Sequence, residues 1–134
     1  MKVFRNFCSG IVFLFSFSSL ANQEITFVGD YTYYTDAESL EYLGDVVCFN
    51  PNDETAKLVI RKQKSNRSVW FCFAPNIEAR KSLKVPPKKQ GHCGYSGTAS
   101  IIVSNYTDTG GYEPDTAKLN KVLSLGKVKE ILCQ

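Results

Sequence analysis

The sequence predicts a small, mainly β domain of the α+β class that is held together by two disulfides. Three observations lead to this fold class. Several short stretches alternate apolar and polar residues with the period of two that strands require. The chain has 134 residues, of which 43% are hydrophobic, and this size suits one folded domain. Four of its five cysteines follow an apparent export signal, and an even cysteine count in a small exported chain favours disulfides.

Residues 1–21 have the pattern of a Sec-type signal peptide. A basic start precedes an apolar stretch at residues 11–17 and a small-x-small cleavage site that ends at Ala21. Removal of this segment would take Cys8 away and leave one β-rich, disulfide-stapled domain at residues 22–134. The remainder contains no second long apolar stretch, so we expect no transmembrane segment after cleavage and a periplasmic or secreted location.

The first half of this domain contains the clearest strand patterns. Residues 24–34 alternate as a strand, in which Gly29 indicates a bulge or a tight bend. Residues 36–43 suggest a short helix, with Thr35 or Asp36 as its cap and Gly44 just past its end. A brief strand at 45–49 and a turn at 50–53 follow. Residues 56–62 and 68–74 then predict a β-hairpin.

The second half alternates between helix and strand signals. Asn76 predicts the start of a helix that runs to about Leu83, with acidic and basic residues placed to suit the helix dipole. Residues 98–106 predict a strand, and residues 127–133 a final short one. Residues 114–125 are ambiguous, because Leu119, Val122 and Leu123 have the spacing of a helix face.

We take the order of the main elements as strand, strand, strand, helix, strand, strand, with local helical turns added. Five strands with one helix between the third and the fourth is the layout of an OB-like barrel. The run Phe27-Val28-Gly29-Asp30-Tyr31-Thr32-Tyr33, then Asp36-Ala37, and later Tyr106 followed by Asp115-x-Ala-x-Leu119, resembles small bacterial periplasmic OB-fold proteins. The resemblance covers about half of the exported domain and implies a binding or stress-related module without a catalytic site.

The four remaining cysteines are predicted to form structural disulfides. Cys48, Cys72, Cys93 and Cys133 contain no Cys-x-x-Cys pair, so neither a zinc ribbon nor a thioredoxin-like motif is present. Three pairings are possible. From the layout of the elements we prefer Cys72–Cys93 with Cys48–Cys133, since the first would pin the helix to the hairpin and the second would anchor the C-terminus.

No pattern in the sequence indicates a metal, a cofactor or a catalytic residue. His92 is the only histidine, and it lies beside a cysteine that we expect to be oxidised, so we interpret it as a solvated loop residue. Ser96 lies in Gly94–Gly97, which lacks the full Gly-x-Ser-x-Gly motif and is expected to form a turn.

Charge is distributed unevenly along the chain. Residues 22–56 carry eight acids and no base, whereas residues 57–89 carry ten bases and one acid. Either these segments neighbour each other in the fold, or a basic face meets an acidic partner. The domain without its signal has 14 basic and 13 acidic residues, which makes nucleic acid an unlikely partner.

The best candidate for a ligand site is the tip of the predicted hairpin. Four cations crowd it and an aromatic residue lies just inside its second arm: Arg61, Lys62, Lys64, Arg67 and Trp70. Cations beside an aromatic ring can hold an oligosaccharide or an anionic polymer through stacking and charge pairing. The alternative is a solvated hairpin tip with Trp70 in the core.

The sequence therefore predicts an exported, non-catalytic binding module that recognises a protein, a glycan or an anionic surface. Two alternatives remain open. One is a small secreted hydrolase with carboxylates near Asp30, Asp36 or Glu38, and the other is a structural envelope component. A pocket with two convergent carboxylates would favour the enzyme, and a basic or aromatic face without one would favour the binding module.

Overall fold

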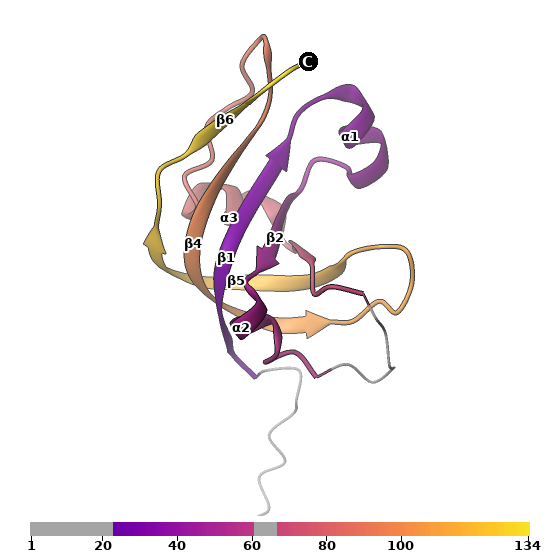
Figure 1. Cartoon of the computed structure of the whole chain (residues 1–134), viewed down its shortest axis with the longest axis vertical. Coiled ribbons are helices and arrows are strands. Elements are labelled where there is room, and N and C mark those ends of the chain that lie inside the picture. Colours follow the sequence, from indigo (N-terminus) through magenta and orange to yellow (C-terminus); the bar gives the residue numbers. More distant parts are fainter. Residues whose placement is uncertain (1–22, 61–66) are drawn as a thin grey trace, which may run out of the picture.

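A computed structural model of the chain describes residues 23–60 and 67–134, and the signal prediction lies outside them. The described residues form a mainly β domain with two disulfides, as predicted. Its elements are β1 (Ile25–Tyr34), α1 (Ala37–Leu43), β2 (Val47–Pro51), α2 (Asp53–Ala56), β3 (Phe71–Phe73), α3 (Asn76–Ser82), β4 (His92–Thr107), β5 (Asp115–Leu125) and β6 (Lys129–Leu132) (Figure 1).

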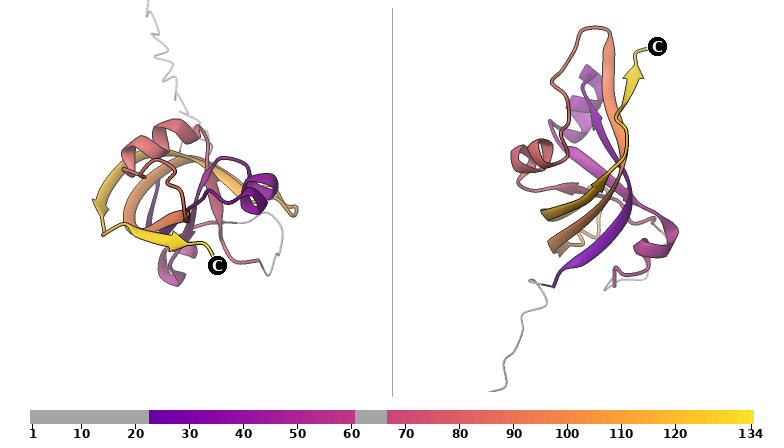
Figure 2. Two further views of the ribbon diagram at one scale, coloured as in Figure 1. Left: turned by 90° about the horizontal axis from the view of Figure 1, so that it is seen from above. Right: turned by 90° about the vertical axis from the view of Figure 1, so that its left-hand side faces the viewer.

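Five of the strands are joined in a ring of pairings, β1–β2–β3–β5–β4 and back to β1. All neighbours in the ring are antiparallel except β3 and β5, which run parallel. The sixth strand, β6, joins only β4, and it lies beside the first part of that strand (Figures 1 and 2). The short α3 occupies the connection between β3 and β4.

The long strand β4 holds the ring together because it pairs with β1, β5 and β6. Its residues 94–103 face β1, and its residues 99–107 face β5. The β4–β5 ladder contains three register shifts, and bulges of this kind bend a strand and increase its twist. Two of these shifts place the extra residue in β5 and one places it in β4, so the ladder is irregular where the 16-residue β4 passes from β1 to β5.

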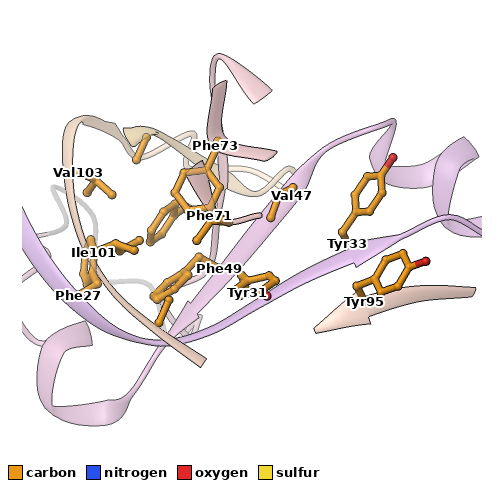
Figure 3. Close-up of a cluster of buried hydrophobic side chains, with 14 residues drawn as sticks. Phe27, Tyr31, Tyr33, Val47, Phe49, Phe71, Phe73, Tyr95, Ile101 and Val103 are labelled. Atoms are coloured by element: carbon orange, nitrogen blue, oxygen red, sulfur yellow. The ribbon is translucent and has the colours of Figure 1, made fainter. Parts of the chain in front are cut away.

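The core lies inside the ring and is rich in aromatic residues. Alternate residues of β1, β2 and β3 point inward, and Phe27, Phe49, Phe71 and Phe73 form one cluster with Ile101 and Val103 (Figure 3). The ring centroids of Phe71 and Phe73 lie 5.5 Å apart at 88°, the edge-to-face geometry that aromatic pairs prefer. Tyr33 and Tyr95 extend the core at one end.

Gly29 lies within a strand whose register is continuous, so the bulge that was one of the two alternatives predicted at this position is wrong. Gly29 pairs with Pro51 on one side and with Ala99 on the other without a register shift. A Cβ atom here would lie 2.0 Å from the backbone oxygen of Asn50. The glycine is therefore needed because β2 approaches closely.

The predicted hairpin is also wrong. Residues 53–56 form α2, residues 57–60 are not in a strand, and β3 is limited to Phe71–Phe73. The cause is local capping: the side chain of Asn52 accepts a hydrogen bond from the backbone N–H of Thr55. The Thr55 hydroxyl in turn bonds the backbone of Val28, which fastens α2 to β1.

The ambiguous segment is a strand rather than a helix, because β5 spans Asp115–Leu125. Leu119 lies opposite Val103, and Val122 lies opposite Ile101. A register shift between Ile102 and Val103 inserts one extra residue into β5, so two core-facing residues are three positions apart. The bulge therefore imitates the spacing of a helix.

The disulfides are Cys48–Cys72 and Cys93–Cys133, so both preferred pairings are wrong. Cys48 and Cys72 are directly opposite each other in the β2–β3 ladder. Cys93 lies in the part of β4 that pairs with β6, and Cys133 follows β6 directly. Each bridge therefore follows a strand pairing that the sequence does not specify.

Two smaller predictions are corrected as well. Pro75, not Asn76, caps α3, and the Asn76 side chain instead donates to the backbone oxygen of Asp45 and accepts from the N–H of Val47. His92 and the expected turn at Gly94–Gly97 both belong to β4. The predicted cap at Asp36 and the helix end at Gly44 are confirmed.

Candidate functional site

The predicted basic site is only partly within the described residues. Arg61, Lys62 and Lys64 lie outside them. The Nη2 atom of Arg67 lies 3.2 Å from the backbone oxygen of Glu113 and 3.9 Å from Oδ1 of Asp115. Trp70 is half-buried, and its backbone oxygen accepts a hydrogen bond from the N–H of Asp115. The segment that leads into β3 is thus fastened to the start of β5.

Asp115 organises this junction as a fully buried carboxylate. The hydroxyl of Tyr106 donates to Oδ2, and the N–H of Thr109 donates to Oδ1 at 3.3 Å. A buried charge needs such partners to offset its desolvation. Arg67 is one of these partners, so part of the predicted ligand site has a structural role instead. Tyr112 lies in the same connection and is fully exposed.

The three carboxylates of the hydrolase alternative occupy different settings. Asp36 caps α1, and hydrogen bonds from the N–H and hydroxyl of Ser39 lower the pKa of its carboxyl group. A lowered pKa favours the ionised form, which suits a cap and opposes the role of a general acid. Glu38 is exposed in the first turn of α1, and Asp30 lies on the outer face of β1.

A shallow groove of about 510 Å³ lies on the outer face of β1, β4 and β6, where Asp30 is found. The outward residues of β1 and β4 are matched in register, so Asp30 faces Thr98 and Thr32 faces Ser96. Lys129 continues the second row, because it lies opposite Ser96 in β6. Four strands thus contribute the side chains that line the groove, which are polar except for Ile131: Asp30, Thr32 and Tyr34 from β1, Asn50 from β2, Ser96 and Thr98 from β4, and Lys129 and Ile131 from β6, with Lys127 just before β6.

Close packing beneath the groove fixes its floor. Gly97 lines the groove, and a Cβ atom at this position would lie 2.6 Å from the hydroxyl oxygen of buried Tyr31. This Cβ atom would lie on the core side of β4, because Gly97 pairs with core-facing Tyr31, so the glycine lets the ring of Tyr31 pack directly beneath the groove.

The groove combines groups that hold a polar ligand. It offers a carboxylate, an amide, three hydroxyls, two ammonium groups and the ring of Tyr34, which is 40% exposed. Within residues 23–60 and 67–134, Asp30, Lys127 and Lys129 form no ion pair. A volume of about 510 Å³ falls within the range of about 300–1,000 Å³ that is usual for small-molecule sites.

Sequence reasoning missed this groove because no single segment contains it. The alternation of β1 does predict that Asp30, Thr32 and Tyr34 share one face. The partners of that face depend on the β1–β4 and β4–β6 registers, and the β4 start was predicted to be a loop and a turn. The outward polar residues of β1 were the only signal available in the sequence.

A second hollow of about 400 Å³ lies where the connector before β4 covers Tyr95. The Tyr95 hydroxyl donates to the backbone oxygen of Pro87 at 2.9 Å. Half-buried His92 stacks on the ring of Tyr95, and its Nδ1 lies 3.3 Å from Oε2 of Glu130. The two atoms are close, but the contact lacks the geometry of a hydrogen bond. These interactions hold the connector in place, so the second hollow has a structural explanation.

Among the described residues, no group of three or more His, Cys, Asp or Glu side chains is arranged to hold a metal ion. In the same part of the chain, no helix has the length and apolar character needed to cross a membrane. Comparison of the chain with protein-family models, with curated proteins and with solved structures finds no match.

Proposed function

We propose that this chain is an exported, non-catalytic module that binds a glycan in the groove on β1, β4 and β6. The observation that carries the proposal is the composition of the groove, in which hydroxyl, amide and charged groups surround a single exposed tyrosine ring. Sugars present many hydroxyls and one apolar ring face. Such a ligand requires several hydrogen-bonding groups and an aromatic surface in the same place.

The proposal includes a closed OB-type barrel. The ring order β1–β2–β3–β5–β4, the parallel β3–β5 pair and the position of α3 between β3 and β4 support it. In barrels of that type the face of the second and third strands is the usual ligand site. The groove lies mainly on β1, β4 and β6, with Asn50 as its contribution from β2, so the glycan proposal rests on the groove itself rather than on the fold.

The export part of the proposal rests on the disulfides and on the signal pattern at residues 1–21. Structural disulfides persist in oxidising compartments such as the periplasm or the extracellular space. The basic start and the cleavage site of the segment agree with export to such a compartment.

Binding is favoured over hydrolysis because, among the described residues, the groove contains one carboxylate and not a pair. Most glycosidases place two carboxyl groups on either side of the scissile bond. Asp30 is the one carboxylate that lines the groove among the residues that the structure describes. Asp36 is engaged as a helix cap, and its lowered pKa disfavours proton donation.

The test is a calorimetric titration of the protein, purified after export, with neutral, carboxylated and sulfated tetrasaccharides. We expect at least one tetrasaccharide to bind. Replacement of Tyr34 by alanine should weaken that binding roughly tenfold, which corresponds to about 1.4 kcal/mol, because the stacking surface is lost. Tyr112→Ala is the matched control, since it removes an exposed tyrosine elsewhere and should leave the affinity unchanged.

Failure of every tetrasaccharide to bind would contradict the proposal and favour a structural component. Equal losses of affinity in Tyr34→Ala and Tyr112→Ala would show that the binding site is not in the groove. Shortened sugars in the titrated sample would contradict the non-catalytic part of the proposal and would support the alternative that the protein is a secreted hydrolase.

A further inference from the structure

The two margins of the groove differ in charge, and this difference indicates what kind of glycan the groove binds. Along one row the residues Thr32, Ser96 and Lys129 follow one another across β1, β4 and β6. Along the neighbouring row Asn50, Asp30 and Thr98 follow one another across β2, β1 and β4. The β6 margin therefore carries ammonium groups, and the β2 margin carries a carboxylate and an amide.

Lys127 lies in the short connection that leads from β5 into β6, and Lys129 is the first residue of β6. The N–H of Gly126 donates to the backbone oxygen of Thr98 at 2.8 Å, which holds this connection against β4. A Cβ atom at Gly126 would lie 2.0 Å from the Thr98 hydroxyl, so any side chain at this position would require Thr98 to move. Lys127 and Lys129 are thereby placed together at the edge of the groove.

These two cations differ from the arginines of the described chain. Arg80 pairs with Asp45 at 3.3 Å, and Arg67 contacts the buried Asp115. Lys127 and Lys129 form no ion pair with any described residue, although Asp30 lines the same groove. Two unpaired ammonium groups on one margin attract an anionic group, and Asp30 repels it from the opposite margin.

Resting on the proposed function, we infer that the groove selects an acidic oligosaccharide. Its carboxylate or sulfate group lies against Lys127 and Lys129, and hydroxyls of the neighbouring ring reach Asp30 and Asn50. The ring of Tyr34 contacts the apolar face of a sugar. The carboxylate and sulfate forms share the same anionic chemistry, and the two acidic ligands of the test distinguish them.

The test compares three tetrasaccharides: oligogalacturonate, a sulfated heparin fragment and neutral maltotetraose. The test variant is Lys127→Ser with Lys129→Ser. The control is Lys118→Ser with Lys121→Ser, which removes the same charge from exposed positions of β5 outside the groove. Both variants have equal net charge, so a loss limited to the first reports the position of the lysines.

We expect an acidic tetrasaccharide to bind the unmodified protein more tightly than maltotetraose. The groove variant should lose roughly tenfold or more of that affinity, the control should lose little, and added salt should weaken acidic binding alone. The preference for oligogalacturonate or for the heparin fragment assigns the anionic group.

Three results would overturn the inference. If maltotetraose binds as tightly as the acidic ligands and the groove variant is unchanged, the selection is wrong while the glycan proposal stands. Equal losses in both lysine variants, or equally tight competition by a 20-nucleotide single-stranded DNA, would indicate nonspecific charge attraction. If no tetrasaccharide binds at all, the proposed function itself fails.

Discussion

At the scale of single residues, Tyr33, Asp45 and Arg80 form a cluster that joins α3 to the loop before β2. The Tyr33 hydroxyl donates to the Asp45 carboxylate, and the Arg80 guanidinium carbon lies 4.5 Å from the centre of the Tyr33 ring. Burial, followed by the hydrogen bond to Asp45, raises the pKa of Tyr33 to about 12. The protonated tyrosine therefore favours the folded state, and this contribution is lost as the pH rises from 10 to 12.

The cluster predicts a specific change in alkaline stability. Tyr33→Phe should lower the free energy of unfolding at pH 7 by about 1 kcal/mol, because one partly buried hydrogen bond is lost. Above pH 10 the variant should lose less further stability than the unmodified protein. Urea unfolding at pH 7, 10 and 12 measures both effects, with Tyr42→Phe, which alters an 84% exposed tyrosine, as the control. An identical alkaline loss in Tyr33→Phe and the unmodified protein would contradict the assignment.

Individual residues were predictable where their partners are local. The cap at Asp36 and the end at Gly44 follow from neighbours within one or two turns of α1, and both are confirmed. Asn76 was misread as a cap because its partners, Asp45 and Val47, lie about 30 positions away. A short sequence window contains no information about such a contact.

At the scale of elements, β1 and the main part of β4, at residues 98–106, were predicted as strands, whereas the bulged β5 was not. β1 has a continuous register and was recognised within one residue. β5 contains a bulge that breaks the period of two, so its sequence also fits a helix. The disulfide pairings failed for a related reason, since each bridge depends on which strands are neighbours.

The bridge between Cys93 and Cys133 should hold β6 to β4. Replacing both cysteines by serine opens a 40-residue loop, and the chain-entropy model gives a loss of about 4 kcal/mol in the free energy of unfolding. Hydrogen exchange should also become faster in residues 129–132. The matched variant Cys48→Ser with Cys72→Ser opens a 24-residue loop, for which the same model gives about 3.5 kcal/mol.

The two disulfide variants separate a global effect from a local one. Both should have a lower urea midpoint, but only the Cys93 and Cys133 variant should lose protection of β6 under conditions in which the protein remains folded. Equal protection of residues 129–132 in the two variants would show that the bridge does not anchor this strand.

At the scale of the whole molecule, the sequence was sufficient for the class of fold and insufficient for the site. The mainly β composition and the presence of two disulfides were predicted and are confirmed. The groove arises from residues that are as many as about 100 positions apart, and only the strand order brings them together. The predicted basic site, by contrast, was visible as a local cluster in the sequence, and Arg67, its described cation, contacts the connection before β5 and Asp115 at the start of β5.

The most direct test of the glycan-binding account is a map of backbone amide NMR shifts as the preferred tetrasaccharide is added. The account predicts that the largest shifts occur in residues 30–34, 94–98 and 127–131, which surround the groove. If the largest shifts occur at residues 67–70 and 108–114, around Arg67 and Tyr112, the account is contradicted. Such shifts would indicate that the ligand binds the segment before β3.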